Sequence, residues 1–301
     1  MQKLKLTAII MLSLVQGCWL TGKNYQAPEK NEQKVVIEEE NISQAKPDGN
    51  LIRFIAVGDT GTGTESQYKV ARAMEDKCKK DGCDFGLLLG DNIYNSGVVN
   101  VNDPQFITKF ETPYKNLALK FYLTLGNHDY RGNVQAQVDY TKKSSKWVMP
   151  GKTYHFSKGP VEFFSVDTNE PSKKQADELE KELKASKARW KIVFGHHPRY
   201  TNGVYKNATG ALAQLLDAPC GKADLYLCGH EHDKQHLKKV CGVNYLIVGT
   251  GAGLRPTNIK ENTLFAKSSL GFSWFEINNS SMHFQILDTT GNIEYEYTEK
   301  K

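Results

Sequence analysis

The sequence has no dense block of Lys and Arg with interleaved aromatic residues, and its formal net charge is only +5 over 301 residues. This charge pattern argues against nucleic acid as a partner. The charged and apolar fractions, 24% and 39%, are ordinary for a globular protein, so composition indicates a soluble, folded chain and nothing narrower. The length suits one large domain or two small ones.

The cysteines do not have the spacing of a zinc cluster, which argues against a structural zinc site built from them. Cys78 with Cys83 and Cys220 with Cys241 are plausible disulfide pairs in an exported chain, although sequence does not fix the connectivity. Cys228 lies in an apolar run, where a buried free thiol is the expected state.

The run Gly249–Gly253 is not followed by the Lys-Ser/Thr pair of a P-loop, so it does not predict a phosphate-cradling loop of that kind. We expect it to shape the rim of a site instead. His155, His236 and His283 belong to no motif and are expected to be ordinary strand or surface residues.

The N-terminal apolar run, residues 6–15, is too short to span a bilayer but follows Lys3 and Lys5, which predicts a signal peptide over residues 1–17. The run closes with Gly17-Cys18, which resembles the lipobox of bacterial lipoproteins, in which the cysteine is lipidated after cleavage. The alternative is an ordinary secretory signal in which Cys18 is incidental. Both interpretations predict export. The chain is then anchored at the cell envelope (periplasmic or surface) through Cys18 alone, or secreted.

Residues 18–50 are polar and charged without sustained periodicity, and they predict a solvated tether. Helices are predicted for Thr64–Lys80, for the segment from Asp103-Pro104 to about Pro113, and from Ser172, with a capping box to Gln175, to about Arg189. Residues 130–151 are expected to form a long loop, and the tail after residue 243 is expected to be rich in strands.

Five apolar runs, each typical of a buried strand, end in Gly followed by side chains that can bind metal. Because sites in open α/β sheets form beyond the carboxyl ends of strands, we expect these five loops to meet in one crevice. The runs and loops are Leu51–Val57 with Gly58-Asp59, Phe85–Leu89 with Gly90-Asp91-Asn92-Ile93-Tyr94, Phe121–Leu125 with Gly126-Asn127-His128-Asp129, Lys191–Phe194 with Gly195-His196-His197-Pro198, and Asp224–Cys228 with Gly229-His230-Glu231-His232.

These loops contain too many candidate ligands for one first-row ion and about the right number for two, with a carboxylate such as Asp91 able to bridge. Taken singly, each side chain also fits loop capping or turn chemistry. Their joint occurrence after strands is what predicts a two-metal site. The candidates are Asp59, Asp91, Tyr94, Asn127, His196, His230 and His232.

Taken together, the five motifs resemble those of a known family. Asp59-x-Gly61, Gly90-Asp91-x-x-Tyr94, Gly126-Asn127-His128-Asp129, Gly195-His196-x-Pro198 and Gly229-His230-x-His232 are similar to the five blocks of calcineurin-like metallophosphoesterases. Tyr94 narrows the resemblance to the purple acid phosphatases, and residues 127–137 are similar to the small, tartrate-resistant type. The resemblance covers the chain from about Ile52 onward and identifies residues 51–299 as a catalytic domain.

The resemblance implies an α/β fold in which two mixed β-sheets form a sandwich flanked by helices. It implies a ferric ion held by Asp59, Tyr94 and His232, and a divalent ion (Fe, Zn or Mn) held by Asn127, His196 and His230, with Asp91 bridging. Charge transfer from the Tyr94 phenolate to iron would colour the protein purple.

The implied reaction is hydrolysis of a phosphate monoester by in-line attack of a metal-bound hydroxide, with His128 protonating the leaving alkoxide or stabilising its charge. His197 stands where the small mammalian-type enzymes have Tyr, and we expect it either to touch substrate or to shift the pH optimum. The family's further substrate-side His is not evident, and Tyr205 falls nearest to it. Two alternatives stay open: a phosphodiesterase or nucleotide pyrophosphatase of the same superfamily, and a non-catalytic surface binding protein on this scaffold.

Overall fold

The computed structural model describes residues 50–301. The predicted signal peptide, Cys18 with its predicted lipid, and nearly all of the predicted tether therefore lie outside the described residues. Within residues 50–301, no helix is long and apolar enough to cross a membrane.

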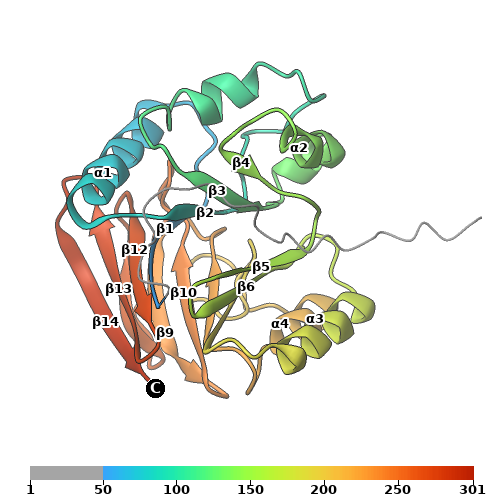
Figure 1. Ribbon diagram of the computed structural model, residues 1–301, viewed down its shortest axis with the longest axis vertical. Helices are drawn as coiled ribbons and strands as arrows, with labels where there is room; N and C mark the ends of the chain where they lie inside the picture. Colours follow the sequence, from blue (N-terminus) through green and yellow to red (C-terminus); the bar gives the residue numbers. More distant parts are fainter. Residues whose placement is uncertain (1–49) are drawn as a thin grey trace, which may run out of the picture. The chain divides into compact units, whose positions relative to one another are not determined.

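The first sheet has seven strands in the order β14-β13-β12-β1-β2-β3-β4 (Figure 1). β1 to β4 are parallel to one another, and β12, β13 and β14 extend the sheet antiparallel from β1. Its strands are β1 (Leu51–Val57), β2 (Phe85–Leu89), β3 (Lys120–Thr124), β4 (Trp147–Val148), β12 (Gly271–Asn278), β13 (Ser281–Asp288) and β14 (Ile293–Lys300).

The second sheet also has seven strands, in the order β11-β9-β10-β8-β7-β6-β5. β6, β7, β8 and β10 are parallel, while β5 and β9 pair antiparallel with their neighbours. Its strands are β5 (Tyr154–Lys158), β6 (Val161–Ser165), β7 (Trp190–Phe194), β8 (Leu225–Cys228), β9 (Lys234–Val240), β10 (Val243–Val248) and β11 (Thr263–Lys267).

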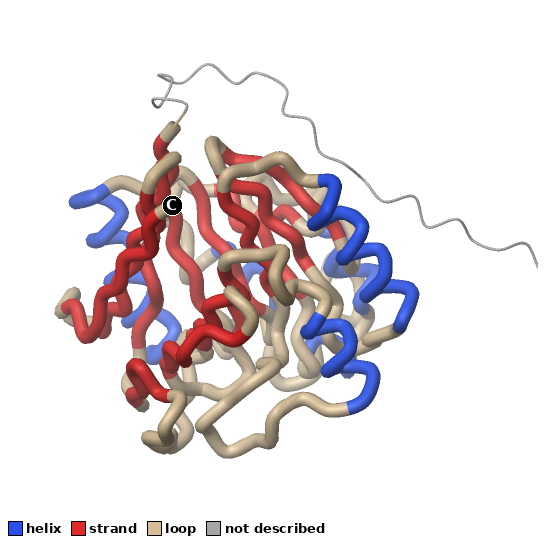
Figure 2. Tube along the Cα trace, turned by 90° about the horizontal axis from the view of Figure 1, so that it is seen from below, coloured by secondary structure: helices blue, strands red, loops and turns tan. Residues whose placement is uncertain are grey.

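Helices cover the outer sides of the two sheets (Figure 2). α1 (Glu65–Asp81) contacts β12 of the first sheet, and the apolar side chains of α3 (Lys173–Ala185) and α4 (Gly210–Asp217) pack with β7 and β8 of the second. The shorter elements are η1 (Ile107–Glu111), η2 (Asp129–Arg131) and α2 (Val134–Tyr140). The predicted fold class, two mixed sheets flanked by helices, is confirmed.

Aromatic side chains join the two sheets in the core. Phe54 on β1 stacks on Phe275 of β12, with ring centroids 4.4 Å apart, and meets Phe163 of β6 edge-on at 5.4 Å. Burying such a side chain contributes roughly 1.5–3 kcal/mol. This packing fixes the carboxyl ends of β1 and its neighbours relative to the strands of the second sheet.

The helix predicted from Ser172 to about Arg189 forms but ends at Ala185, because Ser186 adopts an extended ψ of 132°. The Ser172 hydroxyl accepts a hydrogen bond from the Gln175 N–H (3.2 Å), as a capping box requires. The Gln175 side chain, however, pairs with the N–H and carbonyl of Asp167 (2.9 and 3.0 Å), so the second half of the predicted box is not made.

Two further segments differ from the expectation. The helix predicted after Asp103-Pro104 includes the wide turn η1, although Phe106 and Phe110 are buried as the pattern requires. The segment 130–151, predicted as a long loop, contains α2 and the short strand β4. There Trp147 is fully buried and donates its indole N–H to the Gln137 carbonyl (3.0 Å), which the polar local sequence does not indicate.

Both predicted disulfides form. Cys78 pairs with Cys83 and Cys220 with Cys241, with Cα atoms 5.0 and 5.3 Å apart. Cys228 is a buried free thiol, as predicted. Disulfides of this kind persist in oxidising compartments, which supports export of the chain.

Candidate metal centre

The five predicted loops meet at the carboxyl ends of strands from both sheets. Backbone hydrogen bonds join them directly: Asp59 N–H donates to Gly90 O (3.0 Å) and Gly229 N–H to His196 O (3.1 Å). Gly58 N–H also reaches Val248 O at the end of β10 (2.7 Å), which connects the first sheet to the second. The loops that follow β1, β2, β3, β7 and β8 therefore surround one site.

Three candidate ligands form a first group, which we call the phenol group (Asp59, Tyr94 and His232). The Tyr94 hydroxyl lies 2.9 Å from Asp59 Oδ1 and 3.0 Å from His232 Nε2. His232 Nε2 lies 3.2 Å from the same Asp59 oxygen. Three donor atoms at these separations can share one cation.

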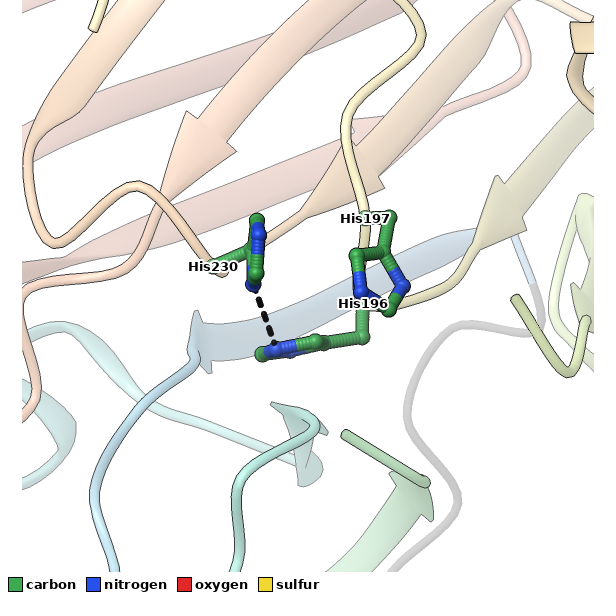
Figure 3. Close-up of side chains that lie close together, drawn as sticks. All are labelled: His196, His197 and His230. Carbon is green, nitrogen blue, oxygen red and sulfur yellow. Dashed lines mark hydrogen bonds between the residues drawn. The ribbon is translucent and has the colours of Figure 1, made fainter. Parts of the chain in front are cut away.

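A second set, the imidazole group (Asn127, His196 and His230), lies beside it. His196 Nε2 lies 3.2 Å from both Asn127 Oδ1 and His230 Nδ1. Figure 3 shows the His196 and His230 rings directed at each other, with His197 alongside. Two nitrogens and one amide oxygen suit a divalent first-row ion.

Asp91 lies between the two groups. Its Oδ2 is 3.5 Å from His196 Nε2, and Asp59, Asp91 and His196 offer donor atoms all within 4.8 Å of one another. Its Oδ1 accepts the backbone N–H of His128 (2.8 Å), which fixes the orientation of the carboxylate. Asp91 is therefore placed to contact cations held by either group.

The donor set fits metal ions. His196 Nδ1 donates to the Leu89 carbonyl (2.9 Å), so Nε2 is the nitrogen that faces the Asn127 oxygen. A cation between these two atoms, either a proton on Nε2 or a metal ion in its place, stabilises the pair. Ligating histidines generally hold their other ring nitrogen in this way.

The buried charges show the same need for a cation. Burial lowers the pKa of His196, but the Asp91 carboxylate outweighs burial and raises that pKa to about 9. Burial, and then the charges of Asp59 and Asp91, raise the pKa of Tyr94 far above its ordinary value. A site this rich in buried carboxylate therefore attracts positive charge, which metal ions would supply.

Four of these residues have a left-handed backbone that non-glycine residues rarely adopt. The φ angles are +59° at Asp59, +54° at Asp91, +70° at His230 and +44° at His232. Such conformations cost on the order of 1–3 kcal/mol each and gather at functional sites. Here they turn each side chain into the crevice immediately after its strand.

Glycines allow the loops to approach the ligands. A Cβ at Gly126 would lie 2.1 Å from the backbone nitrogen of Asp91, and one at Gly253 would lie 2.8 Å from His232 Nδ1. A Cβ at Gly249 would lie 2.8 Å from Asp59 Oδ2. The run Gly249–Gly253 thus lines the rim of the site, as predicted.

His128 lies at the edge of the centre without joining either group. Its Nδ1 donates to the Asn95 carbonyl (2.7 Å), which leaves Nε2 directed toward Asp91, 3.9 Å from Oδ2. The ring packs against that of Tyr94, with centroids 4.4 Å apart. Nε2 is therefore the nitrogen that faces a group bound at the centre, and in the imidazolium form it can donate a proton to that group.

His197 lies against the imidazole group, its ring centroid 4.4 Å from that of His230. Its Nδ1 pairs with the Thr168 hydroxyl (2.8 Å), and that hydroxyl also accepts the His197 N–H (3.1 Å). Burial, and then the neighbouring His196, lower the pKa of His197 to about 3, so the ring is neutral. Thr168 gave no signal in the sequence, because a lone Thr fits any strand end.

Two buried carboxylates that support the site were not identified as functional from the sequence. Asp129 accepts hydrogen bonds from the N–H groups of Gly126 (2.8 Å), Asn92 (3.0 Å) and Ile93 (3.1 Å), and so ties the loop after β3 to the loop after β2. Glu231 accepts from the Thr201 hydroxyl at 2.6 Å. The only sequence signal for a role of these two residues was their position, because each lies inside one of the five motifs that contain the candidate ligands.

The fold and the two donor groups define a calcineurin-like phosphoesterase. The family profile with that description matches residues 52–234, and the chain belongs to that family.

Within the family, the chain belongs to the purple acid phosphatases. It is 34% identical to purple acid phosphatase 7 of Arabidopsis thaliana, covering 82% of this chain and 85% of that relative. It is 30% identical to human tartrate-resistant acid phosphatase type 5, covering 80% and 88%. The fold also matches a solved structure described as GAP50, the anchor in the inner membrane complex of Plasmodium, with a TM-score of 0.75, 24% identity and coverage of 83% and 89%.

Proposed function

We propose that this protein is a di-metal acid phosphatase that hydrolyses phosphate monoesters at the centre formed by the phenol and imidazole groups. Family membership makes it a metal-dependent phosphatase. The observation that carries the assignment is the convergence of five loops on two donor groups with Asp91 between them. A scaffold kept only for binding would not need this complete set of donors.

The ligands divide by their chemistry. Carboxylate and phenolate are hard donors, so Asp59, Tyr94 and His232 would hold Fe(III), and Asp91 would be shared. Asn127, His196 and His230 would hold a divalent ion, for which Fe, Zn and Mn are the candidates. Two ions in such a site supply an activated water and neutralise the charge of the phosphoryl group.

His128 and His197 would act on the substrate itself, His128 on its leaving group. His128 Nε2 is free because Nδ1 donates to the Asn95 carbonyl, so the imidazolium form can give its Nε2 proton to the departing alkoxide and become neutral. His197 is neutral and tethered to Thr168, which suits a substrate contact at the edge of the imidazole group.

The two disulfides support export of the chain, and attachment to a membrane is part of this proposal. The lipobox-like Gly17-Cys18 would attach the chain to a membrane through a lipid on Cys18, with the tether holding the catalytic domain (residues 51–299) away from the surface.

The test compares the wild type with Asn127→Ala, His128→Gln and the exposed control Asn116→Ala on phenyl phosphate and diphenyl phosphate, with elemental analysis of each protein. The wild type should prefer the monoester. His128→Gln should lower kcat by about 10²-fold or more with its metal retained, whereas Asn127→Ala should lose both activity and metal. Undiminished monoester hydrolysis by Asn127→Ala, or a wild type that prefers the diester, would overturn the proposal.

A further inference from the structure

A guanidinium and a phenol lie together at the rim of the metal centre, outside the ligand groups. Arg255 Nη1 donates to the His230 carbonyl (2.9 Å), and its guanidinium carbon lies 5.1 Å from the centroid of the Tyr205 ring. The Tyr205 ring stacks on that of His230, with centroids 4.3 Å apart and planes at 22°. We call Tyr205 and Arg255 the rim pair.

Hydrogen bonds to the loop after β8 hold both members of the rim pair in place. Buried Glu231 accepts the backbone N–H groups of Val204 (2.9 Å) and Tyr205 (3.1 Å), which fixes the loop that carries the phenol. The Arg255 N–H donates to the His232 carbonyl (2.9 Å), which fixes the other side. Both side chains are thus anchored to the segment that supplies two metal ligands.

Within the described residues, the charge of Arg255 has no counterion. Arg53, Arg72 and Arg199 are each paired with a carboxylate, whereas Arg131, Arg189 and Arg255 have no carboxylate within 4.0 Å among residues 50–301, and of these three Arg255 is the one that contacts His230. Only one of its side-chain N–H groups has a protein acceptor in that part of the chain. A half-buried guanidinium with free donors is a ready site for a carboxylate or phosphate.

The position of Arg255 indicates which part of a substrate it would meet. It contacts the backbone carbonyl of His230 and not Nδ1, the atom that faces the other candidate ligands, so it lies beside the imidazole group and outside the set of donor atoms. The Tyr205 ring is already packed against His230 and Arg255, so it supports the guanidinium rather than offering a free face to an uncharged aromatic group.

We propose that Arg255, supported by Tyr205, binds a second anionic group on the leaving side of the substrate, so that the enzyme prefers phosphate esters carrying a further carboxylate or phosphate. This inference rests on the proposed function, because it concerns the substrate of the same centre. Arg255 would act through attraction and hydrogen bonding, so its effect should appear mainly in KM.

The test uses two esters that differ only in one carboxylate, phenyl phosphate and 4-carboxyphenyl phosphate. In the wild type, kcat/KM should favour the carboxylated ester, and in Arg255→Gln the ratio of the two kcat/KM values should fall at least fivefold. In Arg255→Lys the ratio should fall less than in Arg255→Gln. Tyr205→Phe should leave the ratio unchanged, and Tyr205→Ala should lower it. Arg72→Gln, which removes an equal charge from α1, should leave the ratio unchanged.

Calorimetric binding of benzylphosphonate and 4-carboxybenzylphosphonate provides a readout independent of turnover, and the preference in Kd should fall with the same variants. A ratio unchanged in Arg255→Gln, by both readouts, overturns the inference and leaves the phosphatase assignment intact. A wild type that hydrolyses neither ester would instead refute the proposed function, and the inference with it.

Discussion

At the scale of single residues, His236 on β9 is a buried titratable side chain outside the metal centre. Its Nδ1 lies 3.0 Å from the Tyr295 hydroxyl and its Nε2 lies 3.3 Å from Asn244 Oδ1, and the ring is fully buried. Burial lowers its pKa from the ordinary 6.5 to about 4. Between these two values the unfolded chain binds a proton that the folded protein does not.

We therefore expect the free energy of unfolding to fall as the pH drops from about 6.5 toward 4, by up to about 3 kcal/mol from this residue. His236→Gln removes the titration, so its free energy of unfolding should vary less with pH over that range. Urea unfolding at pH 7.5 and pH 5 measures the difference. His283→Gln, at a less buried position, is the control. An identical pH dependence in wild type and His236→Gln would contradict a role for His236 in the acid sensitivity of the fold.

Single residues also show why only part of the site could be predicted. The seven ligand candidates were recognisable because each follows a strand and a glycine, a pattern that local sequence carries. Glu231 and Arg255 were not, because their roles depend on the loop 201–205 folding against them, a contact that sequence spacing does not encode.

At the scale of elements, the turn after β3 has to pass directly against Asp91. A Cβ at Gly126 would lie 2.1 Å from both the backbone nitrogen and Oδ1 of Asp91, so Gly126→Ala must displace that carboxylate. We expect the variant to lose activity by about 10²-fold or more, because displacements of about 1 Å at reacting groups have that effect. It should also bind less metal.

Steady-state assays with elemental analysis check this expectation. Gly151→Ala is the matched control, since a Cβ there meets only the Thr153 carbonyl at 3.3 Å and the loop is distant in sequence from every ligand. Full activity and metal content in Gly126→Ala would show that the turn does not position Asp91.

Elements with regular apolar patterns were predicted well, and those stabilised by tertiary polar contacts were not. β9 begins Lys234-Gln235-His236, a polar sequence that does not indicate a buried strand. It is buried because each side chain finds a partner, as when Gln235 accepts the Asn202 N–H (2.8 Å) and His236 meets Tyr295. The end of α3 at Ala185 was not predicted either, since no sequence signal near Ser186 distinguishes residue 185 from residue 189.

At the scale of the whole molecule, a buried ion pair joins the two sheets. Lys234 on β9 of the second sheet pairs with Glu294 on β14 of the first, and both side chains are almost fully buried. Glu294 also accepts from Lys267 (2.9 Å) and the Ser269 hydroxyl (2.8 Å). Burial lowers the pKa of Lys234, and Glu294 opposes that effect.

Removing one partner should destabilise the protein more than removing both. We expect Glu294→Gln to lower the free energy of unfolding by about 3–5 kcal/mol, because it leaves the Lys234 charge buried without a carboxylate. The double variant Lys234→Met/Glu294→Leu should recover most of that loss. Denaturant unfolding measures both, with Lys173→Met in an exposed pair as the control. A single variant no less stable than the double would contradict a role for the pair in joining the sheets.

The central claim is that strand ends distant in sequence jointly hold two metal ions, one of them bound by Tyr94. The most direct measurement is elemental analysis with a visible absorption spectrum, on the wild type and on Tyr94→Phe. The expected result is two ions per chain, including one iron, and an absorption band that disappears in the folded Tyr94→Phe variant. Folded wild-type protein with less than one ion per chain, or a band that persists without the Tyr94 hydroxyl, would contradict the claim.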